Sequence, residues 1–561
     1  MTAKAIEHAL SAKDPERAAD LVERAAEETW KRSELATFIR WVDGLPREVV
    51  QARPMLGVYY AMGLLMAGRP MYEVEERLKD VAPHPRRTGV AAATSVSGGV
   101  AAFRALVAAY QGNVDVSIEN AGQALEILPE ESAFLRSMVH GILALAHLYG
   151  GDIQVATESL KVAAHAAKTA GNPLNAAMAL CHLAELAMLQ GKLVDAEVRF
   201  AEALEAATDD AGQPLPIAGL ALIGMGQILL ERYDLDAAAH CLKRGIELTS
   251  QWGEPGAIQG HIALAHVRQA QGSPDRAREH LQKAEGIAAR FDAMELDDLE
   301  VAMYRARLCI AEGDLEAAER WAEERGLYGS PDRACREPEH DNGSCLQRYL
   351  RVGESITLAE LLIARSRQQR LAADRGRDLR DAEEVLRPLL QKAEAEGHHR
   401  RSIRILVLLS LTSEAQGDTS RALTSLERAL SLALPERYVQ PLVHTGEPME
   451  RLLRKVHLRG ISPSYAQQLL TLLQNGEKAV SGAGAHDPST ALIPTSLYEP
   501  LSQREREVLG LLVTSLSSTE IAEQLYISVN TVRSHIRSIY GKLDVHSRFE
   551  AVARAQELQL L

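Results

Sequence analysis

The sequence predicts an all-α protein, in which a superhelix of stacked helix pairs is followed by a small four-helix domain. Three observations predict this architecture. Alanine and leucine dominate while aromatic residues make up 4% of the chain, a composition that favours helices over strands. One pattern recurs about every 40 residues, which is typical of stacked repeats. The C-terminal stretch contains a series of helix N-caps. At 561 residues, the chain is too long for a single hydrophobic core.

Residues 1–89 are expected to form an N-terminal helical segment built from helical pairs. The opening stretch, "MTAKAIEHALSAKDPERAAD", predicts an amphipathic helix and lacks the features of a signal peptide. Weak copies of the repeat begin at Ala12 and Ala67. No apolar run approaches the roughly 20 residues of a membrane span, so a cytoplasmic location is expected.

Residues 90–445 contain the regular repeats. Each begins with a turn, usually containing a glycine, that is followed by an amphipathic helix. The turn markers are Gly112, Gly151, Gly191, Arg232, Gly272 and Gly313, spaced 39 to 41 residues apart, and a late copy begins at Gln416. The glycine lets the chain reverse after the first helix, and an alanine four to six residues later lets the second helix pack closely. Such units bury their apolar faces on their neighbours. The period exceeds the 34 residues of the tetratricopeptide (TPR) unit, so we predict a TPR-like superhelix.

Two segments interrupt the periodicity. Residues 328–345 lack it and predict an exposed loop. Residues 446–500 predict a helical tail and then a flexible linker, because 475–500 is rich in Gly, Ala, Ser and Pro. The helix-turn-helix candidate described below occupies 501–561.

The five cysteines predict neither a disulfide framework nor a metal site. Cys335 and Cys345 flank His340, but their spacing matches no zinc pattern, so a metal clip is the minor alternative to a loop. The others lie in helical apolar patterns and are expected to be small buried hydrophobes: Cys181, Cys241 and Cys309. An odd number of cysteines without an export signal fits a reducing compartment.

Charge is distributed unevenly along the chain. The formal net charge is −14, yet residues 501–561 hold seven basic and seven acidic residues. Residues 527–548 hold four basic residues and one acid. Because an acidic body repels nucleic acid, any contact with nucleic acid is expected at the C-terminal end.

Four short helices are predicted in the C-terminal domain, near 502–515, 518–526, 529–543 and 547–558. Capping boxes pair Ser502 with Glu505, Ser517 with Glu520 and Ser547 with Glu550, and Ser528 is a good N-cap for the third helix. The apolar stripe of the third helix is Val532, Ile536, Ile539 and Leu543. Its opposite face is polar and basic. The second and third helices, joined by a tight turn, predict a helix-turn-helix unit.

This C-terminal region resembles the DNA-binding domain of LuxR-type regulators in "LSQREREVLGLL", "EIA", "ISVNTVRSHI", "IYGKLDV" and "SRFEAVARA". The resemblance implies that the third helix enters the major groove and that the fourth dimerises. The DNA-binding residues it implies are Asn530, Thr531, Arg533, Ser534, His535, Arg537, Ser538 and Lys542. Of these, Arg533, Ser534 and Arg537 would face base edges, and Thr531, His535 and Ser538 would lie near the backbone. The dimerisation residues it implies are Ser547, Glu550, Ala551 and Arg554.

The upstream region resembles the MalT-like large regulators in "WVDGLPREVVQARPML", "IAEGDLEAAERWAEE", "SITLAELLIARSR" and "EAQGDTSRALTSLERALSLALPERYVQPLV". The resemblance implies an ATPase, a winged-helix segment, a helical-repeat sensor and a LuxR-type domain, in that order. No G-x-x-x-x-G-K-[ST] loop occurs in this sequence, so an ATPase domain is absent and no cofactor is expected. Residues 1–89 would then be a remnant of the region between winged helix and repeats. The chain is either a natural short form or a fragment of a longer ATP-dependent regulator.

We therefore expect a bacterial, nucleoid-associated transcriptional regulator. Its superhelix would sense a small-molecule or protein effector and control a domain that binds double-stranded promoter DNA as a homodimer, with RNA polymerase as a further candidate partner. The main alternative is a repeat scaffold whose C-terminal domain mainly dimerises. An enzyme is not expected, because the histidines are scattered: His261 and His266, for example, are five residues apart and make no ligand pair.

Overall fold

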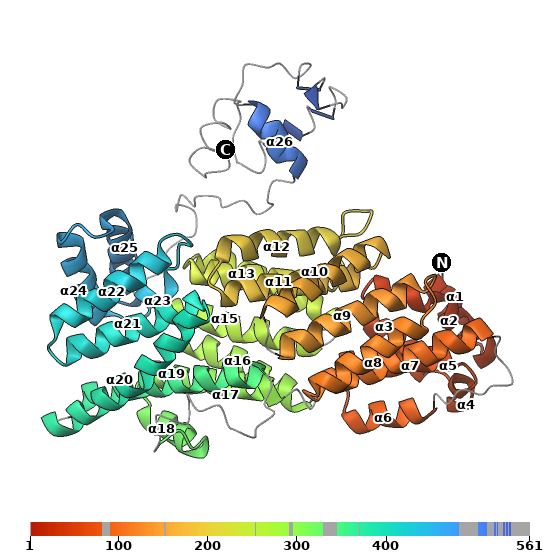
Figure 1. Ribbon diagram of the computed structural model, residues 1–561, viewed down its shortest axis with the longest axis horizontal. Coiled ribbons are helices and arrows are strands. Elements are labelled where there is room, and N and C mark those ends of the chain that lie inside the picture. The colour runs from red at the N-terminus through yellow and green to blue at the C-terminus, as the bar shows by residue number, and fades with distance from the viewer. Residues whose placement is uncertain are drawn as a thin grey trace. The chain divides into compact units, whose positions relative to one another are not determined.

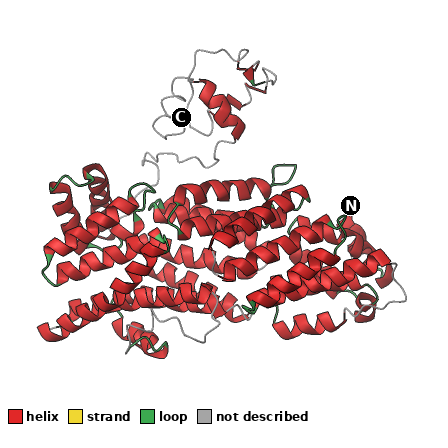
Figure 2. Cartoon of the chain, viewed as in Figure 1, coloured by secondary structure: helices red, strands yellow, loops and turns green. Residues whose placement is uncertain are grey.

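The computed structural model describes most of the residues of the chain. Described are residues 2–80, 90–150, 153–252, 254–290, 295–328, 345–369, 371–481, 503–512, 521–522, 524–525, 531–532, 535–536 and 538–539. In this part the chain is helical (Figure 2) and forms no strand, apart from one isolated bridge between Thr208 and Pro214. The chain divides into two compact units, Met1–Gly482 and Ala483–Leu561. The all-α prediction is confirmed.

The first unit begins with a group of six helices, of which the second, third and fifth pack through aromatic side chains. These six helices are α1 (Thr2–Ser11), α2 (Pro15–Lys31), α3 (Leu35–Asp43), α4 (Arg47–Gln51), α5 (Pro54–Met66) and α6 (Met71–Asp80). Trp30 packs against Phe38 and Tyr59, with ring centroids 6.2 and 6.1 Å apart. These helices join the rest of the unit, because α2 contacts α11 and α3 contacts α14. None of the described helices is long and apolar enough to cross a membrane.

Eight helix pairs follow, each packed as an antiparallel hairpin. The first four pairs are α7 (Val90–Tyr110) with α8 (Val114–Ile127), α9 (Ala133–Gly150) with α10 (Ile153–Thr169), α11 (Pro173–Leu189) with α12 (Leu193–Ala206), and α13 (Ala218–Glu231) with α14 (Leu235–Trp252). After η1 (Glu254–Ala257) come α15 (Ile258–Ala270) with α16 (Pro274–Arg290), α17 (Glu295–Glu312) with α18 (Leu315–Glu324), α19 (Cys345–Gln368) with α20 (Ala372–Ala395), and α21 (His399–Ala415) with α22 (Thr419–Ala433). Figure 1 shows these pairs stacked along the unit. The predicted helical-repeat architecture is confirmed.

In six of the pairs, the described turn contains a residue with positive φ. Gly112, Gly191, Gly272, Gly313 and Gly417 have φ between 70° and 85°, a conformation that glycine adopts without steric cost. In the α13–α14 turn the prediction is wrong by one residue. Arg232 has a φ of −82° and Tyr233 takes the left-handed conformation at 64°. The half-buried Tyr233 ring packs against the main apolar core, which offsets the strain of a non-glycine residue in this region.

A small buried residue, usually alanine, lies five positions after most of the turn markers and sets the spacing within the pairs. At most 1% of the surface of each is exposed: Ala156, Ala196, Ala238, Ala277, Ala318 and Ala422. Ser117 takes this place in α8, where its hydroxyl donates to the Ala105 carbonyl at 2.8 Å. Counting from Tyr233 restores the five-residue spacing to Ala238, which supports Tyr233 as the true turn residue. The predicted close packing through alanine is confirmed.

The first helices of the pairs form an inner layer. Each of α9, α11, α13, α15, α17 and α19 contacts the first helix of the next pair, whereas the second helices make no comparable contacts with one another. The layer also closes on itself, because α21 contacts α11, and α23 (Gln440–Val443) contacts α13. We call the circuit α11–α13–α15–α17–α19–α21 the inner ring. The helices α24 (Glu447–Leu458) and α25 (Pro463–Ser481) complete the first unit.

Candidate functional site

In the described part of the second unit, buried apolar residues come from the first three predicted helices. In α26 (Gln503–Leu512), Val508, Leu509 and Leu512 are buried. Ile521 and Ala522 of the predicted second helix are buried as well. Burial of these apolar residues is what the packed helices of a helix-turn-helix domain require.

The described part of the predicted third helix follows its predicted stripe. Val532 and Ile539 are fully buried and Ile536 is half-buried, while Leu543 lies outside the described residues. Thr531, next to Val532, is exposed. The described residues of this helix thus bury the side that the apolar stripe predicts.

The structure describes only some of the predicted DNA-binding residues. Thr531 is exposed, and His535 and Ser538 are half-buried. The others lie outside the described residues: Asn530, Arg533, Ser534, Arg537 and Lys542. The same holds for all four predicted dimerisation residues, Ser547, Glu550, Ala551 and Arg554.

Arg504 is a functional candidate that the sequence analysis missed. Its Nη2 donates to the Leu525 carbonyl at 2.6 Å, and its Nη1 lies 2.5 Å from Glu507 Oε2. The Leu525 amide donates to Ile521 at 3.0 Å, so Leu525 belongs to the last turn of the predicted second helix, where carbonyls lack helical partners. Arg504 thereby joins α26 to the helix end that precedes the predicted recognition helix. The sequence feature that could have identified Arg504 is its position in the first capping box, next to Glu505.

In the first unit, charged side chains from three helices meet on the inner ring. Glu360 of α19 accepts from Arg404 Nε of α21 at 2.9 Å, and its other oxygen lies 3.4 Å from Arg307 Nε of α17. Only 17% of the Glu360 side chain is exposed. Burial alone would raise the pKa of Glu360, but Arg404 and Arg307 together hold it below its usual value. The carboxylate therefore stays charged and links three repeats.

Two histidines and a second carboxyl group complete this region, which we call the inner polar cluster. Burial and the neighbouring Arg307 hold the pKa of His266 well below its usual value, and its ring lies 3.9 Å from that of Tyr304. His444 is exposed, yet desolvation by the surrounding protein lowers its pKa against the opposing effect of Glu360. Burial raises the pKa of Glu300, which accepts from Gln259 Nε2 at 2.6 Å. Both histidines are consequently neutral near pH 7.

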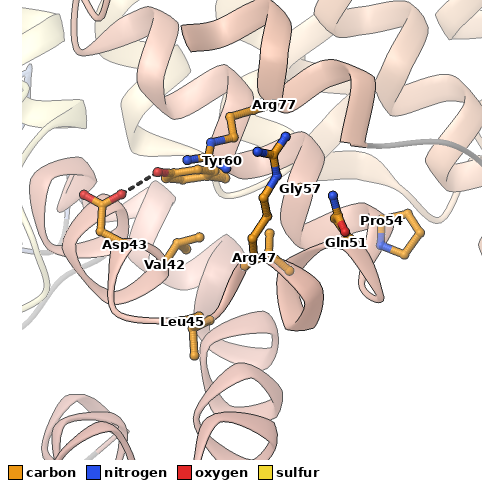
Figure 3. A pocket seen from close by; sticks show the side chains of 10 residues that line it. Val42, Asp43, Leu45, Arg47, Gln51, Pro54, Gly57, Tyr60 and Arg77 are labelled. Carbon is orange, nitrogen blue, oxygen red and sulfur yellow. Dashed lines mark hydrogen bonds between the residues drawn. The ribbon is translucent and has the colours of Figure 1, made fainter.

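A cavity of about 100 Å³ lies among α3, α4, α5 and α6 (Figure 3). Tyr60 donates a hydrogen bond to Asp43 at its rim, and the guanidinium of Arg77 lies 5.8 Å from the Tyr60 ring centroid. Arg47 pairs with Glu76 at 2.9 Å. The polar groups of this cavity have protein partners, so it is a weaker candidate than the inner polar cluster.

The described residues contain no group of three metal-ligating side chains. His261, whose partner the sequence analysis did not predict, faces His280 across the α15–α16 hairpin, with 3.1 Å between their Nδ1 atoms. Burial lowers the pKa of both histidines to about 4. Cys181 is buried, and Cys241 and Cys309 are half-buried; the Cys335–Cys345 loop lies outside the described residues apart from the backbone of Cys345.

Comparison with known proteins identifies both units. Residues 98–459 match the family model described as "MalT-like TPR region", and residues 499–555 match the one described as "Bacterial regulatory proteins, luxR family". The HTH-type transcriptional regulator MalT of Serratia proteamaculans is 25% identical over 574 residues, covering 99% of this chain and 60% of that protein. MalT of Yersinia pestis (strain Pestoides F) is 26% identical over 573 residues, with the same coverage.

The chain therefore spans about 60% of the length of the curated relatives it matches. Among solved structures, a Rap protein complexed with Competence and Sporulation Factor is 11% identical, with a TM-score of 0.44 over 69% of this chain and 99% of that one. This structural likeness is too weak to carry an argument.

Proposed function

The chain belongs to the MalT-like transcriptional regulators with a luxR-type DNA-binding domain, and we propose that its superhelix senses an effector that controls DNA binding. The observation that carries this proposal is the match of both family models in one chain. A repeat array provides a large binding surface, and the second unit supplies a helix-turn-helix. We infer that the chain is a binding protein and not an enzyme.

For the DNA-binding domain, we propose that the third helix enters the major groove. Support comes from the burial of Val532 and Ile539 on one face and the exposure of Thr531 on another. Arg533 and Arg537 fall on the polar face by helical spacing, where an arginine can bond guanine O6 and N7 bidentately or contact phosphates. Both luxR-type family membership and the small size of the domain favour binding as a dimer on paired half-sites.

For the sensor, we propose that the effector binds at the inner polar cluster. Arg307, Glu360 and Arg404 come from three different repeats, so a ligand that contacts them would change how those repeats pack. Arg400 of α21 adds a further cation, bound to Glu231 of α13. Structural ion pairs also occur in repeat proteins, but the concentration of buried charge on the inner side favours a binding role.

Mapping of the DNA bound by the chain in cells tests this function. We expect enrichment at promoters for the wild-type chain and its loss in the Arg533→Ala/Arg537→Ala double variant. Equal enrichment for both proteins would contradict DNA reading by the third helix and would favour the scaffold alternative, in which the C-terminal unit mainly dimerises.

A further inference from the structure

Five basic side chains lie close together where α14 and α16 pack against α15. They are Lys243 of α14, His261 and Arg268 of α15, and His280 and Lys283 of α16, which we call the basic cluster. The two lysines are exposed, and the other three side chains are half-buried. Among the described residues, none of the five forms an ion pair with a carboxylate.

Other basic residues on the same helices do have acidic partners. Arg244 pairs with Glu247 at 3.1 Å on α14, and Arg278 pairs with Asp275 at 2.8 Å on α16. The net charge of the chain is −14, so a basic group that no carboxylate of the described residues balances is an exception in this protein. Because like charges held together repel one another, the basic cluster favours the approach of an anion.

Arg268 is held in place by a neutral partner. Its Nη1 donates to the Gln271 side-chain oxygen at 2.7 Å, and its buried Nε has no hydrogen-bond partner in the described part of the chain. A buried donor without a partner is costly, and an oxyanion beside the guanidinium would reduce that cost. The planar guanidinium is also the side-chain group best suited to phosphate.

The two histidines can present a pair of donors to a ligand. Their Nδ1 atoms lie 3.1 Å apart, so in the neutral pair one Nδ1–H donates to the other Nδ1, and the accepting ring carries its proton on Nε2. Neither Nε2 has a partner among the described residues and neither is fully buried. One added proton on the second Nε2 therefore preserves the Nδ1 hydrogen bond and provides two Nε2–H donors.

The basic cluster and the inner polar cluster lie on different sides of α15. Gln259 and His266 belong to the inner polar side, and His261 and Arg268 follow each of them by two residues. Two residues turn an α-helix by about 200°, which places the two pairs on nearly opposite faces. The basic cluster is therefore separate from the site proposed above for the effector.

We propose that the basic cluster is a binding site for a small oxyanion with two negative charges, such as a phosphate or sulfate group. A tetrahedral oxyanion has acceptor oxygens in several directions, which suits donors that converge from three helices, whereas a carboxylate has two oxygens in one plane. A metal ion is disfavoured, because the lysines and the arginine around the histidines repel a cation. The bound anion joins two successive repeats, and the site does not depend on the proposed sensor function.

Anion binding at this site should be coupled to uptake of a proton. Burial and the neighbouring cations lower the pKa of both histidines to about 4, so the free pair is neutral at pH 7. From α17, Glu300 and Arg305 pair with Gln259 and Glu285 and do not shift either histidine. A bound anion raises the histidine pKa. Affinity should therefore increase as the pH falls through the raised value, and it should level off below about pH 4.

Isothermal titration calorimetry of the full chain with sulfate, at constant ionic strength, tests the site. Sulfate keeps its charge near neutral pH, whereas a phosphate group titrates near pH 6. We expect saturable binding to the wild type and about fivefold weaker binding to Lys283→Gln, which removes one exposed charge from the site. Lys168→Gln removes an exposed charge from α10; it is the matched control and should bind like the wild type.

His280→Gln tests the coupling to protons. Wild-type affinity for sulfate should be about threefold higher at pH 6 than at pH 8, with proton uptake measured in buffers of different ionisation enthalpy. His280→Gln should bind more weakly and lose this pH dependence. The Arg533→Ala/Arg537→Ala double variant should bind sulfate like the wild type, because its substitutions lie in the second unit.

Inorganic phosphate and glycerol phosphate distinguish the two sources of a phosphate group. Equal affinities would identify the free ion as the ligand, and tighter binding of glycerol phosphate would identify an organic phosphate. The proposal is overturned if the wild type shows no saturable sulfate binding, if Lys283→Gln binds as tightly as Lys168→Gln, or if His280→Gln keeps the wild-type pH dependence. These measurements require no DNA, so their failure would leave the regulator function standing.

Discussion

Glu360 illustrates how a single residue connects repeats that the sequence separates. It lies between Arg307 and Arg404, which come from the pairs before and after its own. Removing one member of such a partly buried set leaves the remaining charges unpaired, which costs more than the ion pairs contribute net. Glu300, close by, is the opposite case, because burial raises its pKa and its charged form is disfavoured.

We predict that Glu360→Gln destabilises the first unit by about 1–3 kcal/mol at pH 7. The folded-state pKa of Glu360 lies below its ordinary value of 4.5, so its stabilising effect is present above about pH 4.5 and is lost as the pH falls through the folded value. Melting temperatures of wild type and variant should therefore converge in acid.

Glu300→Gln is the matched control for this prediction. A raised folded pKa means that the ionised carboxylate opposes folding at neutral pH, so replacing it with an amide should leave the melting temperature unchanged or raise it at pH 7. Equal losses in the two variants would show that the cluster responds to any substitution and would contradict the assigned charge states.

At the level of helices, a small buried residue sets how closely two paired helices approach, and one arginine caps the end of a neighbouring helix. Ala277 of α16 is fully buried five residues after Gly272, so α15 and α16 approach closely there. In the second unit, Arg504 of α26 holds the end of the next helix through the Leu525 carbonyl.

Ala277→Leu should destabilise the first unit by about 1–3 kcal/mol, because added methylene groups have no space in a packed interface. Arg276→Leu inserts the same side chain one position earlier, where the native residue is exposed, and should cost less than about 0.5 kcal/mol. Chemical denaturation monitored by circular dichroism measures both. Similar midpoints for the two variants would argue against close packing at this alanine.

Arg504→Met should lower both the stability of the second unit and its DNA affinity, since the end of the second helix loses a charge-assisted hydrogen bond of about 1.5–3 kcal/mol. Arg506→Met, at an exposed position of α26, is the control and should retain stability and most of the affinity. Thermal melting and fluorescence anisotropy distinguish them. Unchanged DNA affinity in folded Arg504→Met would show that this arginine does not position the recognition helix.

At the level of the whole molecule, local patterns predict the repeats but not their closure. The 40-residue period and the alanine at its fifth position are local features, and both recur in the structure. The ring closure joins Val194 to Glu436 and Glu231 to Arg400 across 242 and 169 residues, and nothing in a periodic sequence specifies which turns of a superhelix meet. The sequence analysis assigned the α13–α14 turn to Arg232 and not to Tyr233, because only tertiary packing offsets the positive φ of Tyr233.

The residues of the candidate sites also divide into those that local sequence predicts and those that depend on tertiary packing. The apolar stripe of the third helix follows from spacing, so the burial of Val532 and Ile539 was predictable. The His261–His280 pair and the contact of Arg504 with Leu525 were not, because each joins two helices whose rotation about their axes is set by packing. The roles of the DNA-facing residues depend on the family resemblance and remain predictions.

The most direct test of the regulator function is the affinity of the full chain for its bound genomic fragments at two salt concentrations, measured by fluorescence anisotropy. Arg533→Ala and Arg537→Ala should each weaken binding by about 1–3 kcal/mol and relax sequence preference if the arginine contacts a base. An arginine that contacts only phosphate should weaken all sequences alike and lower the salt slope by about one. Arg506→Ala is the matched control, and melting confirms folding. Wild-type affinity in the folded double variant would contradict DNA recognition by the third helix.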